Sequence, residues 1–277
     1  MIRKSGKNRI SPRITASNRH SRLKTLLTRF GVFIFWIALW QLAAMKIDLE
    51  LILPTPLTCL TTLLSLLPTK ALWFAVGSSM GRIFTGYAIG CIIGMILGAI
   101  AYFLPIAGEF IKPLLTVIKA TPVSSFILLA VLWMSPNSVP VLIAALMVLP
   151  IVFGNTLTGL SEHSAELREV ASIYGLSKLD CARSLFIPAV IPYISAAALT
   201  SLGLAWKAGI AAEILVVTKD SIGQWLYYSK LYFETAQLFA WTVTVIILSF
   251  ALEKIIKLIV NLTDKRNTPT DRKETAK

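Results

Sequence analysis

The chain has 277 residues, of which 56% are hydrophobic and only 15% are charged, and its mean hydropathy is +0.72. An average soluble domain carries about 25% charged residues, so this composition argues against an ordinary soluble enzyme and against a fibrous or disordered protein. In a soluble chain, the net charge of +13 would suggest that the protein binds nucleic acid. Here the basic residues gather at both ends and beside apolar segments. This distribution favours the anionic cytoplasmic face of a lipid membrane as the partner, and not nucleic acid.

The N-terminal segment, residues 1–27, is strongly basic. Residues 1–29 contain nine Lys or Arg and no acidic residue, and an apolar, aromatic run follows over 28–47. A basic run before an apolar run is also the pattern of a cleaved signal peptide, and Gln41-Leu42-Ala43-Ala44 weakly resembles a cleavage site. Because the basic segment is long for that role and further spans follow, we expect an uncleaved first span with a cytoplasmic N-terminus.

Five further apolar segments are long enough to cross the roughly 30 Å hydrocarbon layer as helices. They cover residues 78–103, 110–134, 138–160, 190–217 and 236–262. Pro113 and Pro122 interrupt the third of the six spans, which we expect to be a kinked helix that begins as an interfacial segment. The apolar stretch 57–67 is too short to cross and predicts an interfacial external helix.

The expected fold class is therefore an all-α polytopic membrane protein with about six transmembrane helices. The transmembrane domain covers residues 28–262, and the polar segment 263–277 is expected to be a disordered cytoplasmic tail. With the N-terminus inside, 21 Lys or Arg fall in cytoplasmic segments and Lys207 falls within a span. Five fall outside, namely Lys46, Lys70, Arg82, Lys219 and Lys230. The positive-inside rule thus predicts cytoplasmic N- and C-termini.

The second span carries a glycine every four residues: Gly86, Gly90, Gly94 and Gly98. This spacing places the glycines on one stripe of the helix, where they allow another backbone to approach closely. Helix packing is the favoured interpretation, and a solute path along the stripe is the alternative.

The segment 161–190, between the fourth and fifth spans, is the longest polar stretch that lies between spans. Before Gly175, helical spacing relates four apolar residues: Leu167, Val170, Ala171 and Tyr174. After it, a second apolar stripe that stops at Pro188 comprises Leu179, Ala182, Leu185 and Phe186. We expect a cytoplasmic helix–turn–helix with an apolar ridge, which either packs against its own spans or binds a partner.

The fifth span contains two charged residues, Lys207 and Glu213. A charge at the bilayer centre costs about 2.5–3.5 kcal/mol on insertion scales, so each should face protein or water. Six residues apart, they point in different directions on a straight helix and are poor partners for each other. Two interpretations stay open. Either the two residues lie on a translocation path, where Lys207 helps an anion pass, or Lys207 pairs with another residue and Glu213 sits near the external end.

The loop resembles a known family at this point. Glu169-Val170-Ala171, three residues, Gly175, nine residues and then Leu185-Phe186-Ile187-Pro188 are similar to the EAA loop of permease subunits of binding-protein-dependent ABC importers. The pattern of that loop is E-A-A, three residues, G, nine residues and I-x-L-P. The spacing matches throughout, and Val170, Leu185 and Ile187 replace Ala, Ile and Leu of the pattern.

Further motifs between Leu53 and Leu226, in the same order, resemble the nitrate, taurine and alkanesulfonate permease branch. They are Leu53-Pro54-Thr55-Pro56, Ser79-Met80-Gly81-Arg82-Ile83 with Gly86, Ala120-Thr121-Pro122, Leu132-Trp133, Asn155-Thr156 with Gly159, and Ala205-Trp206 with Ala212-Glu213. The resemblance implies the type I ABC importer permease (MetI-like) fold in a bacterial inner membrane. It also implies three partners: cytoplasmic ATPases, an extracytoplasmic solute-binding protein and a second permease copy, most simply in a homodimer.

The resemblance also implies a role for the loop, because the EAA helix of such permeases docks in a cleft on the ATPase. The coupling loop would then contain Glu169, Val170, Ala171, Gly175, Leu185, Ile187 and Pro188. In this role Ala171 would permit close approach, Gly175 would supply the turn, and Glu169 would accept hydrogen bonds or pair with a basic residue. Pro188 would fix the return to the membrane. Sulfonates, nitrate and small heterocyclic vitamins or precursors all stay open as cargo.

Other function classes fit the sequence less well. It has no G-x-x-x-x-G-K-[ST] signature, so ATP chemistry is expected in a partner and no cofactor in this chain. A membrane-embedded enzyme would need a catalytic set, but His20 and His163 lie in polar segments and no carboxylate pair lies within a span. An autonomous ion-coupled carrier should show acidic residues inside its spans and an internal sequence repeat. Glu213 is the one candidate for such an acid, and the sequence shows no clear repeat. The three cysteines lack metal-ligand spacing, so no metal site is expected.

Overall fold

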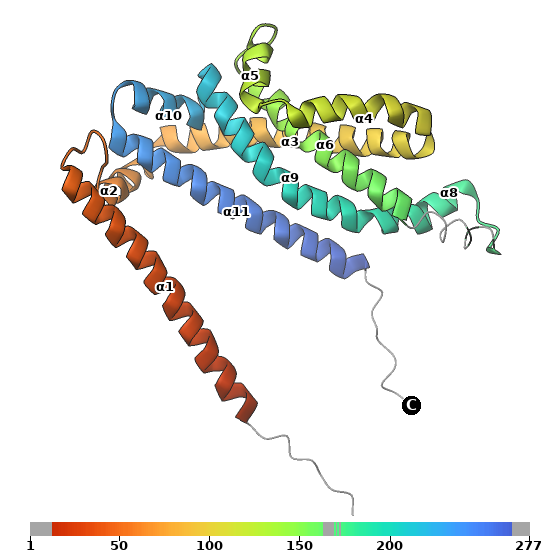
Figure 1. Ribbon diagram of the computed structural model, residues 1–277, viewed down its shortest axis with the longest axis horizontal. Coiled ribbons are helices and arrows are strands. Elements are labelled where there is room, and N and C mark those ends of the chain that lie inside the picture. The colour runs from red at the N-terminus through yellow and green to blue at the C-terminus, as the bar shows by residue number, and fades with distance from the viewer. Residues whose placement is uncertain (1–12, 163–168, 170, 172, 268–277) are drawn as a thin grey trace, which may run out of the picture.

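The computed structural model describes residues 13–162, 169, 171 and 173–267 (Figure 1). Within these ranges the regular secondary structure is helical, without a strand. Five helices are long and apolar enough to cross a membrane, and a bent helix pair makes six if it forms one span. The expected all-α class with about six spans is therefore confirmed.

The long helices are α1 (Arg13–Ile47), α3 (Lys70–Phe103), α6 (Val139–Glu162), α9 (Ile187–Val216) and α11 (Thr235–Asn267). Helix α3 begins eight residues before the predicted span because Thr69 caps it, its side chain accepting a hydrogen bond from the backbone N–H of Leu72. Helix α1 reaches back into the basic N-terminal segment. Helix α11 continues to Asn267, into the segment expected to be a polar tail. Residues 1–12 and 268–277 lie outside the described residues.

The expected third span is not one kinked helix. Helices α4 (Pro105–Ala120) and α5 (Val123–Val131) are bent by 100° relative to each other. The break falls at Thr121, whose backbone is extended, and Pro122. Pro122 has no N–H to donate to a helical carbonyl, and its ring disfavours helical geometry at Thr121. Pro113 is accommodated inside α4.

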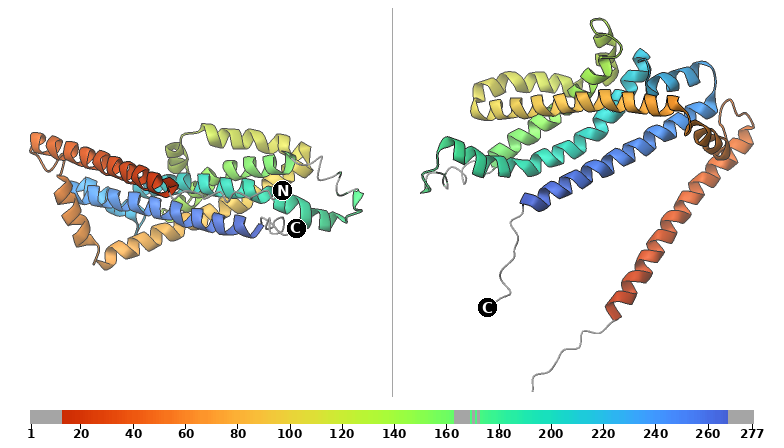
Figure 2. Two further views of the ribbon diagram at one scale, coloured as in Figure 1. Left: turned by 90° about the horizontal axis from the view of Figure 1, so that it is seen from below. Right: turned by 180° about the vertical axis from the view of Figure 1, so that it is seen from behind.

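Helices α3, α6 and α9 form the centre of the molecule and lie side by side in both views of Figure 2. The glycine stripe of α3 faces α6: a Cβ added to Gly86 would lie 2.2 Å from the carbonyl oxygen of Val141, and one added to Gly90 would lie 2.7 Å from that of Ala145. A Cβ at Gly94 or Gly98 would also come within 3 Å of α6 atoms. The glycines therefore lie at the place where the backbones of α3 and α6 approach most closely.

The remaining helices lie at the periphery. Helix α2 (Pro56–Leu66) matches the predicted short apolar helix and is capped by Thr55. Helix α1 stands apart from the bundle (Figure 2), and only 6% of the residues in its most apolar stretch, within Leu27–Ile47, are buried. Trp40 holds its C-terminal half in place, because its indole N–H donates to the carbonyl of Pro54 at 3.1 Å and its ring stacks on Phe239.

Helix α10 (Ile222–Leu231) was not expected from the sequence. Its N-terminus is capped by Ser221, whose hydroxyl accepts from the N–H of Gln224 at 2.9 Å. The side-chain oxygen of Gln224 accepts a hydrogen bond from the backbone N–H of Asp220 at 2.7 Å. A Ser followed three residues later by Gln is a helix-start signal, so this pattern could have revealed α10.

Candidate functional site

The two ends of the bundle carry different groups (Figure 1). At one end lie the end of α3, the end of α6 and the segment that leads into α9. At the other end lie the start of α3, the end of α9, and α2 and α10. The first end contains the predicted coupling loop, and the second contains Glu213.

The first half of the coupling loop ends in a tight turn at Gly175. Glu169, Ala171 and Ile173 are helical, while Val170 and residues 163–168 and 172 lie outside the described residues. Gly175 has a φ of +59°, and the N–H of Leu176 donates to the carbonyl of Ala171 at 3.0 Å. This bond and a left-handed glycine are the marks of a Schellman helix ending. Any side chain at Gly175 would be strained at this φ.

The second half of the loop is helical from Lys178 onward. Ser177 starts α8 (Lys178–Cys181): its hydroxyl accepts from the N–H of Asp180 at 3.2 Å and donates to that residue's carboxylate at 2.6 Å. A π-helix, Ala182–Phe186, then leads directly into α9. The apolar stripe was expected to stop at Pro188, but Pro188 lies in the first turn of α9, where a missing N–H is tolerated.

The residues predicted for coupling are mostly accessible. Glu169, Gly175, Ile187 and Pro188 are exposed, and Ala171 and Leu185 are half-buried. Three large side chains on either side of the Gly175 turn are also exposed, which we call the turn surface: Ile173 (72%), Tyr174 (75%) and Leu179 (77%). Tyr174 and Leu179 belong to the predicted ridge, whereas Ile173 was missed. An exposed apolar surface beside a carboxylate suits a protein partner better than a small solute.

Aromatic contacts join the base of the loop to the bundle. The ring of Tyr193 on α9 lies over Gly159 on α6, where an added Cβ would approach the ring to 2.8 Å. The hydroxyl of Tyr193 donates to the carboxylate of Glu162 at the end of α6. Tyr102 of α3 lies 6.2 Å from Phe186, between ring centroids. Displacement of the loop would therefore be passed to α6 and α9 together.

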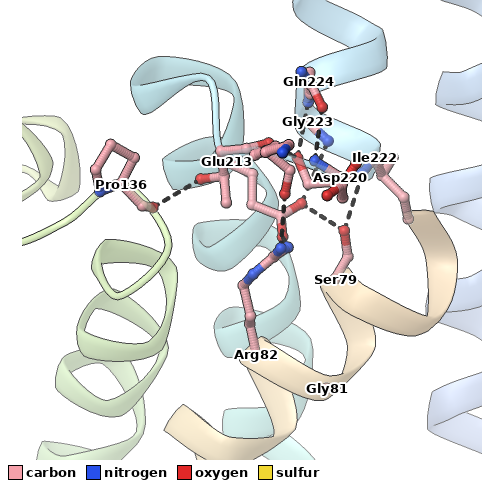
Figure 3. Close-up of polar contacts among 12 residues, drawn as sticks. Ser79, Gly81, Arg82, Pro136, Glu213, Asp220, Ile222, Gly223 and Gln224 are labelled. Carbon is pink, nitrogen blue, oxygen red and sulfur yellow. Dashed lines mark hydrogen bonds and ion pairs between the residues drawn. The ribbon is translucent and has the colours of Figure 1, made fainter. Parts of the chain in front are cut away.

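At the opposite end, Glu213 is the centre of a buried polar cluster (Figure 3). Its side chain is fully buried, and its carboxylate accepts hydrogen bonds from Ser79 at 2.7 Å, Arg82 at 3.2 Å and the N–H of Gly223 at 3.3 Å. Ser79 in turn accepts from the N–H of Ile222 at 3.0 Å. The cluster thus ties α3 and α9 to the N-terminus of α10. A Cβ at Gly223 would lie 2.3 Å from that of Glu213, so only glycine fits there.

These contacts bear on two sequence expectations. Glu213 was a candidate for the translocation path or for a place near the external end, and its fully buried carboxylate, which meets a guanidinium and two further donors, is positioned to hold helices together. Arg82 was counted among the external basic residues, but it lies within α3, pairs with Glu213 and donates to the carbonyl of Lys219 at 2.7 Å. Sequence spacing could not show this pair, because its members are 131 positions apart.

Lys207 differs from Glu213 although both belong to α9. Its side chain is exposed and, within the described part of the chain, it forms no hydrogen bond or ion pair. Over the same residues no group of three or more His, Cys, Asp or Glu is arranged to hold a metal ion.

Comparison with known proteins gives consistent matches. Residues 90–268 match the family described as binding-protein-dependent transport system inner membrane component. The chain is 25% identical over 225 residues to the aliphatic sulfonates transport permease protein SsuC of Bacillus subtilis, covering 80% of this chain and 81% of the relative. It is also 25% identical over 148 residues to the nitrate import permease protein NrtB of Synechococcus elongatus, covering 53% of each chain.

Two further matches are another permease protein and a solved structure. The bicarbonate transport system permease protein CmpB of a Synechocystis strain is 25% identical over 160 residues, covering 57% of each chain. A solved chain from the MetNI methionine ABC transporter in inward-facing conformations matches with a TM-score of 0.53 and 15% sequence identity. The match covers 72% of this chain and 94% of that chain, which confirms the expected fold.

Proposed function

We propose that segment 169–188 is the surface through which a separate ATPase drives solute import, because this chain belongs to the family of binding-protein-dependent transport system inner membrane components. The chain is a transmembrane permease subunit of an ABC importer, and its family is not an enzyme class. The family identification made from the coupling-loop residues is thereby confirmed, and the autonomous carrier is not supported.

The observation that carries this proposal is the geometry around Gly175. The Schellman ending at Gly175 and the capped start of α8 at Ser177 fix a sharp corner. This corner presents the turn surface outward, with Glu169 on the helix that precedes it. In the docked complex Ile173, Tyr174 and Leu179 lose water-exposed apolar area to the ATPase, which stabilises binding.

The proposed transmission from the ATPase runs through the base of the loop. When the ATPases close on ATP, they displace the loop as a rigid body. The contacts of Tyr193 with Gly159 and Glu162 pass this displacement to α6 and α9, which belong to the central helices. The pathway then opens alternately toward the two sides of the membrane.

We assign the loop end to the cytoplasm, together with both termini. The positive-inside rule supports this assignment, and more strongly once Arg82 is removed from the external residues by its pairing with Glu213. The opposite end, with α2 and α10, then faces an extracytoplasmic solute-binding protein. A second copy of this chain completes the pathway in a homodimer.

For the cargo we propose a small anion. Relatives that match this chain are named for aliphatic sulfonates, nitrate and bicarbonate, all of which are small and negatively charged at neutral pH. A heterocyclic vitamin or precursor is the competing cargo class. Uptake of labelled ethanesulfonate, nitrate and a pyrimidine by cells with and without the gene separates the two classes.

The coupling proposal is tested by purification from gently solubilised membranes through a C-terminal tag, with mass spectrometry of the co-purifying proteins. Wild-type chain is expected to bring an ATPase with it. Gly175→Val should reduce ATPase recovery about tenfold, because a β-branched residue disfavours positive φ and moves the turn surface. Gly154→Ala on α6 is the matched control: nothing lies within 4 Å of its added Cβ, and recovery should not change.

Recovery of the intact wild-type chain without any ATPase would contradict the proposal. Equal ATPase recovery by wild type and by a Gly175→Val chain that elutes as a folded protein would contradict the assignment of the docking surface to this turn.

A further inference from the structure

The side chain of Lys207 lies deep in a membrane span. It stands nine residues before Val216, the last residue of α9, and twenty after Ile187, the first. At 1.5 Å per residue these separations are about 14 Å and about 30 Å along the helix axis. A lysine near a helix end can extend its amine to the lipid headgroups, but about 14 Å is beyond the reach of one side chain.

Lys207 differs from the other charged residue of α9. Glu213 is paired with Arg82 at 3.2 Å. Lys207 has no hydrogen bond or ion pair within the part of the chain that the structure describes. An ammonium group in a span, without a partner in its own chain, requires water, a mobile anion or a counter-charge from a second copy of the chain.

Lys207 lies on one continuous exposed face of α9. The other exposed residues at helical spacing on this face are Ala196, Thr200, Leu204, Ala211 and Leu215. Residues 205, 206 and 208–210 beside it are buried in the contacts of α9 with α3, α5, α6 and α11. The face with Lys207 is therefore the side of α9 that the bundle leaves uncovered.

We propose that this face of α9 lines the solute pathway and that Lys207 is the residue that makes the pathway selective for anions. This inference rests on the proposed function, since it needs a pathway, but it assigns a site within it. The positive charge of Lys207 attracts a small anion into a narrow, low-dielectric passage and raises its local concentration. Ala211, one helical turn from Lys207, leaves room for the anion and its water.

The test uses charged thiol reagents, because the cargo is unidentified. Cys59, Cys91 and Cys181 are replaced by Ser, and a single cysteine is introduced as Ala211→Cys, one helical turn from Lys207. The full chain with its ATPase is reconstituted in liposomes and treated on both sides with methanethiosulfonate ethylsulfonate, an anion, or with its ethyltrimethylammonium analogue, a cation. Mass spectrometry gives the two modification rates and their ratio.

With Lys207 present, the anionic reagent is expected to modify the cysteine at position 211 faster than the cationic reagent does. Lys207→Met should lower the anion-to-cation rate ratio about tenfold, at the low end of the effect of focused charge on encounter rates. Lys207→Arg keeps the charge and should keep the ratio.

Ile246→Cys on α11 is the control for membrane depth. The indole N–H of Trp206, next to Lys207, donates to the carbonyl of Val245 at 3.3 Å, so position 246 lies at a similar depth. Ile246 is 47% exposed on an apolar helix face and should react slowly with both reagents.

Two results would overturn the inference. The first is Ala211→Cys reacting as slowly as Ile246→Cys with both reagents, which would mean that the face contacts lipid or protein. The second is an unchanged rate ratio in Lys207→Met. Recovery of the ATPase through the tag, from the same preparations, tests the proposed function separately. A chain that binds its ATPase but fails the reagent test would refute the role of Lys207 and leave the proposed function intact.

Discussion

Glu213 shows how a single acidic residue can be held inside a membrane protein. Its carboxylate receives one charged and two neutral donors from two different helices, Ser79 and Arg82 on α3 and the N–H of Gly223 on α10. The N-terminus of α10 also contributes the partial positive charge of its unpaired N–H groups. The cost of removing the carboxylate from water is offset only while these partners are present.

Arg82→Met should therefore destabilise the protein more than an ordinary substitution in α3. Removing one partner of a buried ion pair leaves an uncompensated charge, which costs about 3 kcal/mol. The measurement is the thermal unfolding of the detergent-solubilised chain, followed by loss of the monodisperse peak.

The double variant Arg82→Met with Glu213→Gln is the informative control. It removes both charges and keeps hydrogen-bonding atoms for Ser79 and Gly223, so it should recover most of the lost stability. A double variant as unstable as Arg82→Met alone would show that the cluster does not depend on charge pairing.

At the scale of the element, the sequence predicts the long helices better than the breaks and corners between them. Apolar length identified the parts of α1, α3, α6, α9 and α11 that can span the membrane, because a span needs about 20 apolar residues. It did not reveal the 100° bend between α4 and α5. Pro122 signals an interruption, but the angle depends on how the flanking helices pack. Helix α10 was missed because it is short, although Ser221 and Gln224 carry a start signal.

The close approach of α3 and α6 gives a prediction for the glycine stripe. Gly90→Ala places a Cβ 2.7 Å from the carbonyl oxygen of Ala145, and a backbone atom cannot rotate away. Such overpacking costs about 1–3 kcal/mol, more than the helix propensity gained from alanine. The thermal unfolding midpoint should fall accordingly.

Gly77→Ala is the matched control on the same helix. Nothing lies within 4 Å of a Cβ there, so only the propensity gain of about 1 kcal/mol applies and the midpoint should stay or rise. If the two variants unfold at the same temperature, the stripe is not a packing contact.

At the scale of the whole molecule, the two ends of the bundle serve different steps of import in this account. The loop end receives the ATPase at the turn surface, and the contacts of Tyr193 with α6 tie the loop to the central helices. The Glu213 cluster braces the far ends of α3 and α9 against α10. In this account α9, which takes part in both ends and carries Lys207 between them, passes the movement of the ATPase to the solute.

The candidate site was predictable from the sequence to the extent that local spacing defines it. The spacing of Glu169, Gly175 and Pro188 predicts a coupling loop, and the local backbone geometry accounts for the glycine at 175. The partners of Glu213 and the contact of Tyr193 with Glu162 join residues far apart in the chain, so no local pattern could reveal them.

The central claim, that the turn at Gly175 is the place where an ATPase drives this permease, is tested most directly by site-specific photocrosslinking in native membranes. Tyr174, 75% exposed at the turn, and Tyr232, 67% exposed at the opposite end of the bundle, are replaced one at a time by benzoylphenylalanine. We predict an adduct with an ATPase from position 174 and none from position 232. An ATPase adduct from position 232, or none from position 174 in chains that still co-purify with the ATPase, would contradict the account.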